Sequence, residues 1–372
     1  MNRRRNNRFT YIIAALIAIG LTLSAVPLSA QNRYLRTNLV SDIPGVANFT
    51  DPHLVNPWGI VATSTSPFWI SDNGAGVSTL YNGQGQAFPT SSPLVVTIPT
   101  PPNAKAGAVA SPTGVVNNAS ADFVVSASGK SGPARFIFAT EDGTINGWNP
   151  TVDATHAILA VNNSGPGRSA DRTGLGAVYK GLAIGNNGSG NFLYATNFRD
   201  AVVEMYDAQF QLVKAFTDPD IPAGFAPFGI RNINNQLFVT YAKQDAKKHD
   251  DVAGEGNGFV DIFDLNGVLQ KRFASQGTLN SPWGLALSPA NFGVFSNALL
   301  VGDFGDGKIN AFDPTTGNFL GQLQDPFGTV TINGLWGLSF GNGGTAGPTT
   351  TLFFTAGIAD EAHGLFGSIV AE

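Results

Sequence analysis

Short apolar runs alternate with turns rich in glycine, asparagine, aspartate and proline along most of the chain. Residues 281–323 show the pattern most clearly, with four β-type runs at 285–287, 299–301, 308–312 and 319–323. The turns at 303–307 and 313–317 supply the positive φ angles and Asx-turn hydrogen bonds that tight hairpins require. The segment therefore predicts one complete four-stranded antiparallel unit.

This unit recurs, and each copy is marked near its start by a glycine that precedes an apolar strand. The six glycines are separated by 55, 67, 48, 55 and 53 residues, and they are Gly59, Gly114, Gly181, Gly229, Gly284 and Gly337. A repeated four-stranded unit with glycine-rich turns is typical of a β-propeller, whose blades surround a central channel. A β-sandwich of unrelated hairpins is the alternative, and six matches in phase disfavour it.

The number of units predicts an all-β, six-bladed propeller. The last unit contains three strands, and an extra strand at 34–40 precedes the first repeat glycine. Pairing of this N-terminal strand with the last blade would close the ring and remove both exposed sheet edges. Seven blades are the alternative, because the long second unit holds an additional run at 121–126, which we interpret as an insertion.

Residues 1–30 differ from the rest of the chain. Four arginines within the first eight residues precede an apolar run at 11–26, and Leu-Ser-Ala at 28–30 is a plausible cleavage site. This order predicts a secretory signal peptide, with a retained membrane anchor as the alternative. We therefore expect a single propeller domain at 31–372, exported to the periplasm or the medium, with no membrane segment after cleavage.

Charge narrows the choice of partner. The chain has 21 basic and 26 acidic residues, and residues 1–30 contain four of the basic ones, so the mature domain carries 17 − 26 = −9. This acidity argues against nucleic acid and anionic lipid. The partner that we expect is therefore a protein, a glycan or a small molecule. We also expect the domain to be monomeric. The absence of cysteine excludes disulfides and thiol nucleophiles.

The residues before the repeat glycines should form a ring on one face, because the loops entering the innermost strands of a propeller share that face. Thr113 holds one position, and the candidate ligand-binding members are Trp58, Lys180, Phe228, Trp283 and Trp336. Aromatic side chains around a concave mouth favour a ligand site. Packing between blades is the alternative role of the tryptophans.

Polar residues of the hairpins between the second and third strands would surround this ring. Four of them, from different blades, are candidate metal ligands: Asp72, Glu141, Asn197 and Asp303. Oxygen ligands suit a hard cation such as Ca²⁺, and no other cofactor is indicated. Turn formation is the alternative role of each residue.

A charged loop between Tyr241 and Phe259 replaces the short hairpin of the fourth unit and should lie over the same face. His249 and Asp250 in this loop, with His363 of the last unit, are the candidate catalytic residues, since a histidine beside a carboxylate suits acid–base chemistry. Two histidines are too few for a three-histidine zinc site. No nucleophile elbow or phosphate-binding glycine loop is present, so the sequence leaves open whether the protein is an enzyme.

Six motifs are combined in this chain. They read Asn-Pro-Trp-Gly-Ile at 56–60, Asp-Asn-Gly at 72–74, Glu-Asp-Gly-Thr-Ile-Asn-Gly-Trp at 141–148, Asp-Asp-Val-Ala-Gly at 250–254, Gly-Asn-Gly-Phe-Val-Asp at 256–261 and Ser-Pro-Trp-Gly at 281–284. Together they resemble an uncharacterised family of exported bacterial propellers related to NHL-repeat proteins, and the resemblance extends over 34–372. Some members carry a C-terminal Pro-Glu-Pro sorting tail, which this sequence lacks. The resemblance implies the fold but carries over no catalytic residue, because the family has no assigned activity.

Two functions follow as hypotheses. The first is an exported binding or interaction module that takes a protein, glycan or small ligand on the face of Trp58, Trp283 and Trp336. The alternative is a metal-dependent hydrolase or lyase, similar to lactonase propellers, in which a Ca²⁺-type ion polarises a carbonyl or activates water.

Overall fold

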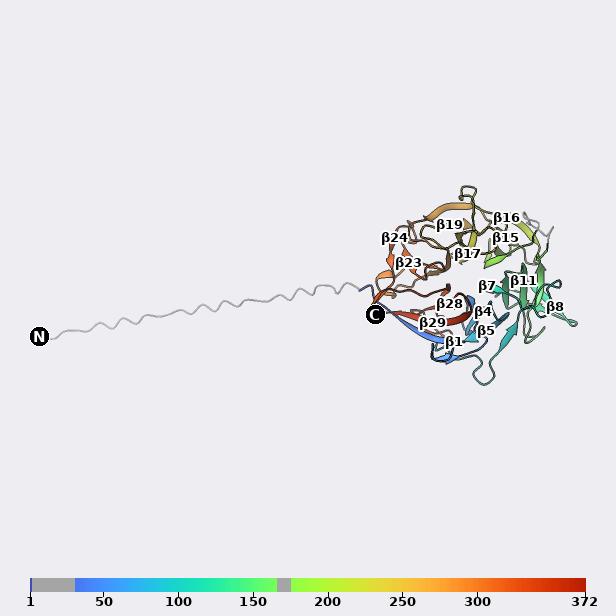
Figure 1. Ribbon diagram of the computed structural model, residues 1–372, viewed down its shortest axis with the longest axis horizontal. Helices are drawn as coiled ribbons and strands as arrows, with labels where there is room; N and C mark the ends of the chain where they lie inside the picture. The colour runs from blue at the N-terminus through green and yellow to red at the C-terminus, as the bar shows by residue number, and fades with distance from the viewer. Residues whose placement is uncertain (2–30, 166–174) are drawn as a thin grey trace. The chain divides into compact units, whose positions relative to one another are not determined.

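The computed structural model describes residue 1 and residues 31–165 and 175–372. The signal peptide expected at 1–30 therefore lies, apart from its first residue, outside the described part. In residues 31–165 and 175–372 the regular secondary structure is almost entirely β-strand, and the sheets are arranged around a common centre (Figure 1). The predicted all-β, six-bladed propeller is confirmed, and the seven-bladed alternative is wrong.

Five blades are four-stranded antiparallel sheets, and all strands are given from the innermost outward. Blades 1 to 3 consist of β3 (Pro57–Val61), β4 (Phe68–Asp72), β5 (Val77–Tyr81) and β6 (Val95–Thr97); β7 (Pro112–Asn117), β10 (Phe136–Thr140), β11 (Thr144–Trp148) and β12 (Ile158–Asn162); and β13 (Tyr179–Asn186), β14 (Asn191–Asn197), β15 (Val202–Tyr206) and β16 (Leu212–Phe216). Blades 4 and 5 consist of β17 (Phe225–Ile233), β18 (Gln236–Lys243), β19 (Gly258–Asp264) and β20 (Leu269–Ser275); and β21 (Pro282–Leu287), β22 (Leu299–Asp303), β23 (Ile309–Phe312) and β24 (Phe319–Gln322).

The sixth blade joins the two ends of the domain. Its strands are β27 (Leu335–Phe340), β28 (Leu352–Ile358), β29 (His363–Ala371) and β1 (Tyr34–Ser41), with the two-residue β2 (Phe49–Thr50) beside β1. β1 pairs antiparallel with β29, from Tyr34 opposite Ala371 to Ser41 opposite Leu365. The expected closure by an N-terminal strand is therefore confirmed.

Three small elements lie outside the blades. β8 (Val124–Ala127) and β9 (Lys130–Pro133) form a separate hairpin between β7 and β10, so the additional run of the second unit is an insertion, as predicted. β25 (Gln324–Asp325) and β26 (Gly328–Thr329) form a second hairpin after blade 5, and a 3-10 turn, η1 (Gly293–Phe295), separates β21 from β22.

The repeat motif lies within the innermost strands rather than before them, which corrects the sequence interpretation. β3 begins at Pro57, and its pairing with β4 shifts register between Pro57 and Ile60, so the glycine sits in a bulge. A Cβ atom on any of the six repeat glycines would lie under 3.0 Å from backbone of the next blade, and the series closes from Gly337 to the carbonyl oxygen of Trp58. Glycine is required because the innermost strands approach one another closely.

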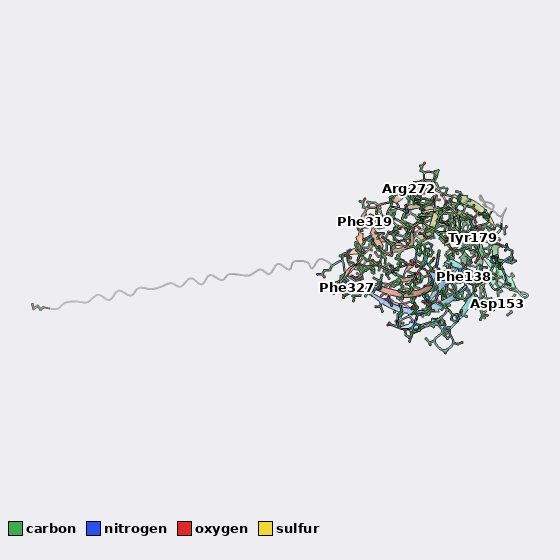
Figure 2. The ribbon with its side chains drawn as sticks, viewed as in Figure 1. Phe138, Asp153, Tyr179, Arg272, Phe319 and Phe327 are labelled. Atoms are coloured by element: carbon green, nitrogen blue, oxygen red, sulfur yellow. The ribbon has the colours of Figure 1, made fainter. Side chains whose placement is uncertain are left out.

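The hydrophobic core lies between neighbouring blades. Trp69 of blade 1, for example, stacks on Phe136 of blade 2 with ring centroids 4.0 Å apart. Phe138 and Tyr179 are fully buried inside the ring of blades, whereas Phe327 is exposed at its periphery (Figure 2). No helix within the described residues has the length and hydrophobicity needed to cross a membrane.

Candidate functional site

Aromatic side chains from several blades meet where the innermost strands begin. Trp58, Phe198, Phe228, Trp283 and Trp336 belong to one cluster, which we call the aromatic plug. The indole rings of Trp58 and Trp336 stack with centroids 3.4 Å apart, and Trp283 meets them edge-on at 6.0 and 5.8 Å. Each member is at most 9% exposed, so the plug is a packed floor.

The structure thus brings the ligand-binding candidates together but buries them, which differs from the expected open ring. The large indoles from three blades fill the space between the innermost strands and contact one another. The Trp336 Nε1–H donates to Oδ1 of Asn56 at 3.2 Å. Thr113, the sixth ring residue, is also buried, and its hydroxyl donates to the carbonyl oxygen of Tyr179 at 2.9 Å. A ligand that reaches this face meets the residues above the plug first.

Lys180 is the one charged member of the ring, and it is only 2% exposed. Its ammonium lies 5.0 Å from the ring centroid of Trp58, forms an ion pair with Glu141 in the β10–β11 turn, and lies 3.6 Å from Oδ1 of Asp250. Burial lowers the pKa of Lys180, but the negative charges of Glu141 and Asp250 outweigh burial and raise the pKa above its usual value. The side chain therefore stays charged over the plug.

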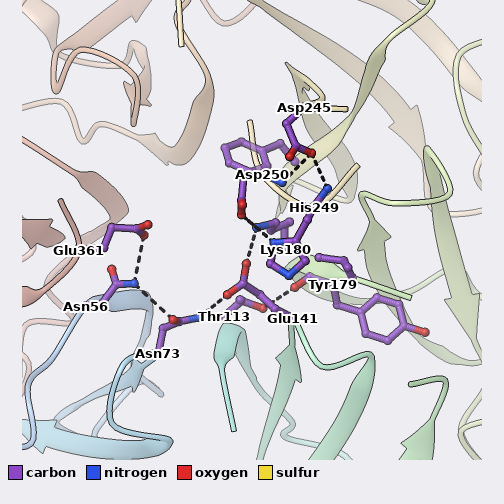
Figure 3. A network of polar contacts seen from close by, with 12 residues as sticks. Asn56, Asn73, Thr113, Glu141, Tyr179, Lys180, Asp245, His249, Asp250 and Glu361 are labelled. Atoms are coloured by element: carbon purple, nitrogen blue, oxygen red, sulfur yellow. Dashed lines mark hydrogen bonds and ion pairs between the residues drawn. The ribbon is translucent and has the colours of Figure 1, made fainter. Parts of the chain in front are cut away.

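Polar side chains continue from Lys180 across three blades (Figure 3). Asn56 donates to Oε1 of Glu361 at 3.0 Å and to Oδ1 of Asn73 at 3.3 Å, and Asn73 donates to Oε2 of Glu141 at 2.9 Å. We call the connected residues the polar rim: Glu361, Asn56, Asn73, Glu141, Lys180, Asp250, His249 and Asp245. The rim brings together turns from blades 6, 1, 2 and 4.

The charged loop between β18 and β19 supplies one side of the rim, as expected. Oδ1 of Asp245 accepts the backbone N–H of His249 at 2.8 Å and that of Asp250 at 3.3 Å, which fixes the loop locally. Nδ1 of His249 lies 2.8 Å from Oδ1 of Asp250. This hydrogen bond, together with the charge of Lys180, lowers the pKa of Asp250 to about 2. Asp250 is therefore a carboxylate over the physiological pH range.

One group of side chains in the described part of the chain is compact enough to hold a metal ion. It consists of Glu141, His249 and Asp250, whose potential ligand atoms all lie within 4.8 Å of one another. The Lys180 ammonium contacts both carboxylates, so an incoming cation would compete with it. The group combines oxygen ligands with an imidazole, which suits Mn²⁺ or Zn²⁺ better than Ca²⁺.

Of the four metal ligands expected from the sequence, only Glu141 belongs to this group. Asp72, Asn197 and Asp303 each end the second strand of a blade, and their side chains turn toward the third strand and are buried there. Each bonds a residue seven positions later, and the pairs are Asp72–Thr79 (2.8 Å), Asn197–Glu204 (2.9 Å) and Asp303–Asn310 (2.6 Å). The same seven-residue spacing is visible in the sequence, and its recurrence indicates that these three residues have a structural role.

The three candidate catalytic residues also do not lie together. His249 and Asp250 lie together in the rim, but Nδ1 of His363 lies 2.6 Å from Oδ2 of Asp42, where β29 begins beside the end of β1. His363 therefore joins the two ends of the domain and is not part of the metal-ligand group. Asn56 was not predicted as a site residue; it directly precedes the Pro-Trp-Gly motif and has a φ of 46°. An asparagine at such a position favours the left-handed conformation.

No family model matches this sequence. The chain is 32% identical over 358 residues to an uncharacterised protein of Acanthamoeba polyphaga mimivirus, covering 93% of this chain and 82% of that protein. A second uncharacterised protein of the same virus is 32% identical over 346 residues, covering 90% and 85%. The chain belongs to the family of these viral proteins. Membership of this family shows common ancestry with the viral proteins. It does not test the bacterial origin or the export that we expect from the sequence, and both remain predictions.

Solved structures share the fold at much lower identity. Virginiamycin B lyase from Staphylococcus aureus superimposes with a TM-score of 0.51 and 13% identity over 91% of this chain and 99% of that one. The soluble aldose sugar dehydrogenase from Escherichia coli gives a TM-score of 0.54 and 12% identity over 91% and 100%. These likenesses establish the β-propeller fold alone, since one fold supports many functions.

Proposed function

We propose that the protein is a binding propeller that takes up a divalent cation at Glu141, His249 and Asp250 and presents it to the oxygen atoms of a glycan or small molecule. The observation that carries the proposal is the 4.8 Å group of ligand atoms, which comes from two separate blades. Convergence of side chains from distant parts of the sequence is uncommon in turns that serve only the backbone. The buried plug provides a rigid floor beneath the group.

The charge of the rim supports a cation as the first ligand. Burial raises the pKa of Asp251 and of Glu361, and neighbouring carboxylates raise both further. Lys180 provides a single positive charge to balance the carboxyl groups of Asp251, Glu361 and Glu141. A bound divalent ion would relieve this repulsion and lower the two raised pKa values, so uptake of the metal should release protons.

The first prediction tests the cation. Thermal melting of the protein with Mn²⁺ or Zn²⁺ should show stabilisation of about 2.7 kcal/mol at a hundredfold excess over Kd, reversed by chelator. His249→Ala and Asp250→Asn should abolish this stabilisation, because the first removes a ligand and the second removes the negative charge of another. Calorimetric titrations in buffers of different ionisation enthalpy should also show proton release.

The chain contains a matched control for these variants. His156 and Asp153 form a second exposed pair, with Nδ1 and Oδ1 3.2 Å apart, and they belong to blade 2 away from the metal-ligand group. His156→Ala should leave the metal-dependent stabilisation unchanged. Equal loss in His156→Ala and His249→Ala, or no stabilisation by any divalent ion, would reject the cation site.

A metal-dependent hydrolase or lyase is the second candidate, and the contact between His249 and Asp250 favours it. In this candidate His249 would not ligate the ion but would act as the general base, with Asp250 orienting its imidazole beside an ion held by Glu141. Lactone and ester substrates should then be turned over in the presence of Mn²⁺, and Asp250→Asn should be at least tenfold slower. Metal binding without any turnover would retain the binding function and reject the enzyme.

A further inference from the structure

The innermost strands enclose a cavity of about 190 Å³ that is separate from the polar rim. Its wall includes the residue after each repeat glycine, and these six side chains are Ile60, Val115, Leu182, Ile230, Leu285 and Leu338. Trp283 belongs both to this wall and to the aromatic plug. The plug therefore lies between the cavity and the rim, and the cavity is a predominantly apolar chamber along the channel.

Among the residues that the structure describes, Arg231 is the only charged one in the wall of this chamber. Its Nη1 donates to the carbonyl oxygens of Leu285 at 2.9 Å and Leu338 at 2.5 Å, so the side chain reaches from blade 4 to blades 5 and 6. A guanidinium has five N–H donors, and these two hydrogen bonds leave three for another acceptor. Within the described residues, no carboxylate lies within 4.0 Å of Arg231, in contrast to Arg33 and Arg272.

An unpaired guanidinium in this setting is energetically unfavourable. The Arg231 side chain is half-buried, and the desolvation of its buried part lowers its pKa. A charge that is partly withdrawn from water is less stable without a counter-charge. Hydrogen bonds to two backbone carbonyls offset part of this desolvation cost. An apolar side chain at position 231 could fill the channel with no desolvation cost. The retained charge therefore points to an anionic partner.

We propose that the chamber binds a small carboxylate with an apolar body. The carboxylate would accept hydrogen bonds from the free edge of the Arg231 guanidinium, whose fork matches two carboxylate oxygens. The body would lie between the side chains that follow the repeat glycines. An apolar cavity of about 150 Å³ holds benzene, so this chamber is large enough for one aromatic ring and its carboxylate. The inference is independent of the cation proposed at the rim.

The test compares benzoate with its neutral isostere benzamide, using calorimetry and ligand-observed NMR on the folded protein. Benzoate should bind at least tenfold more tightly, because only the anion pairs with Arg231. Arg231→Gln keeps a donor for one backbone carbonyl and should remove the difference between the two ligands. Arg231→Lys keeps the charge but not the fork, and should retain only part of the preference.

Arg36→Gln is the matched control, since Arg36 also donates from Nη1 to a backbone carbonyl, that of Thr331 at 2.9 Å, but is exposed. It should leave benzoate binding unchanged, as should His249→Ala at the rim. If Arg231→Gln fails to fold, the wild-type protein still decides the question through its preference for benzoate over benzamide. Equal affinity for the two ligands, or equal loss of benzoate binding in Arg36→Gln and Arg231→Gln, would overturn the proposal.

Discussion

Gly229 shows how a single residue sets the distance between blades. Its N–H donates to Oγ1 of Thr240 in the neighbouring strand at 2.8 Å, and a Cβ atom added to it would collide with the carbonyl group of Trp283 in blade 5. Gly181 repeats the arrangement, since its N–H donates to Thr196. The close approach of the next blade therefore requires glycine here, whereas the N–H hydrogen bond, which any residue except proline could make, holds the position within its own blade.

We predict that Gly229→Ala lowers the free energy of unfolding by about 1–3 kcal/mol, because the added methyl group overpacks the innermost strands. Urea-induced unfolding would measure the change. Gly190→Ala is the control, since its Cβ would meet only the ring of Phe192, at 3.7 Å, and a change within about 0.5 kcal/mol is expected there. Equal destabilisation by both substitutions would contradict the close-approach explanation.

At the scale of elements, an ion pair connects the outer strands of blade 4 to the segment that enters it. Arg272 of β20 pairs through Nε with Asp261 of β19 and through Nη2 with Asp218, which lies between blades 3 and 4. Burial raises the pKa of Asp261 to about 7, although Arg272 opposes the change. One strand thus carries a carboxyl group whose protonation differs between the folded and unfolded chains.

This difference predicts a pH dependence of stability. The unfolded chain releases the Asp261 proton near pH 3.9, whereas the folded chain holds it up to about pH 7. Between these values the folded state binds more protons, so the free energy of unfolding should fall as pH rises. Asp261→Asn should flatten this slope in chemical unfolding between pH 4.5 and 7.5. Asp264→Asn, at the last residue of β19, should keep the wild-type slope, and an unchanged slope in Asp261→Asn would reject the assignment.

At the scale of the whole domain, the pairing of β1 with β29 closes the ring of blades. Besides its pairing with β29, β1 carries Tyr34, whose hydroxyl donates to the carbonyl oxygen of Phe292 in blade 5 at 3.1 Å, and Ser41, whose hydroxyl donates to that of Gly364 at 2.7 Å. Removal of β1 would expose the full edge of β29, and an open edge favours pairing with another chain.

A protein beginning at residue 44 should therefore melt at least 10 °C lower than one beginning at 31, and should self-associate in light scattering after gel filtration. A synthetic peptide of residues 32–43 should restore part of the melting temperature by occupying the edge. Replacement of the turn between Ala127 and Lys130 of the β8–β9 hairpin by Gly-Ser is the control, because this turn lies outside the blades and the substitution leaves the buried Val125 of β8 in place. A truncated chain that melts like the full domain would show that closure contributes little.

Local sequence was sufficient for the fold. Short runs, turn residues and glycines at regular intervals predicted six blades, the closing strand and the β8–β9 insertion, because strand length and turn conformation depend mainly on neighbouring residues. The same pattern placed Trp58, Trp283 and Trp336 in one ring. It could not show that their indoles stack and fill the channel, since that depends on contacts between blades far apart in the chain.

Only the tertiary structure showed which side chains come together at the candidate sites. Asp72 ends a second strand and Glu141 directly follows one, so the two look alike in the sequence, yet Asp72 turns into its own sheet while Glu141 meets Lys180, Asn73 and the loop of blade 4. Arg231 gave no signal, because a charged residue within a strand looks exposed until six strands are seen to surround it. The repeat determines where each blade lies, whereas the direction of a side chain depends on the neighbours that the closed ring brings to it.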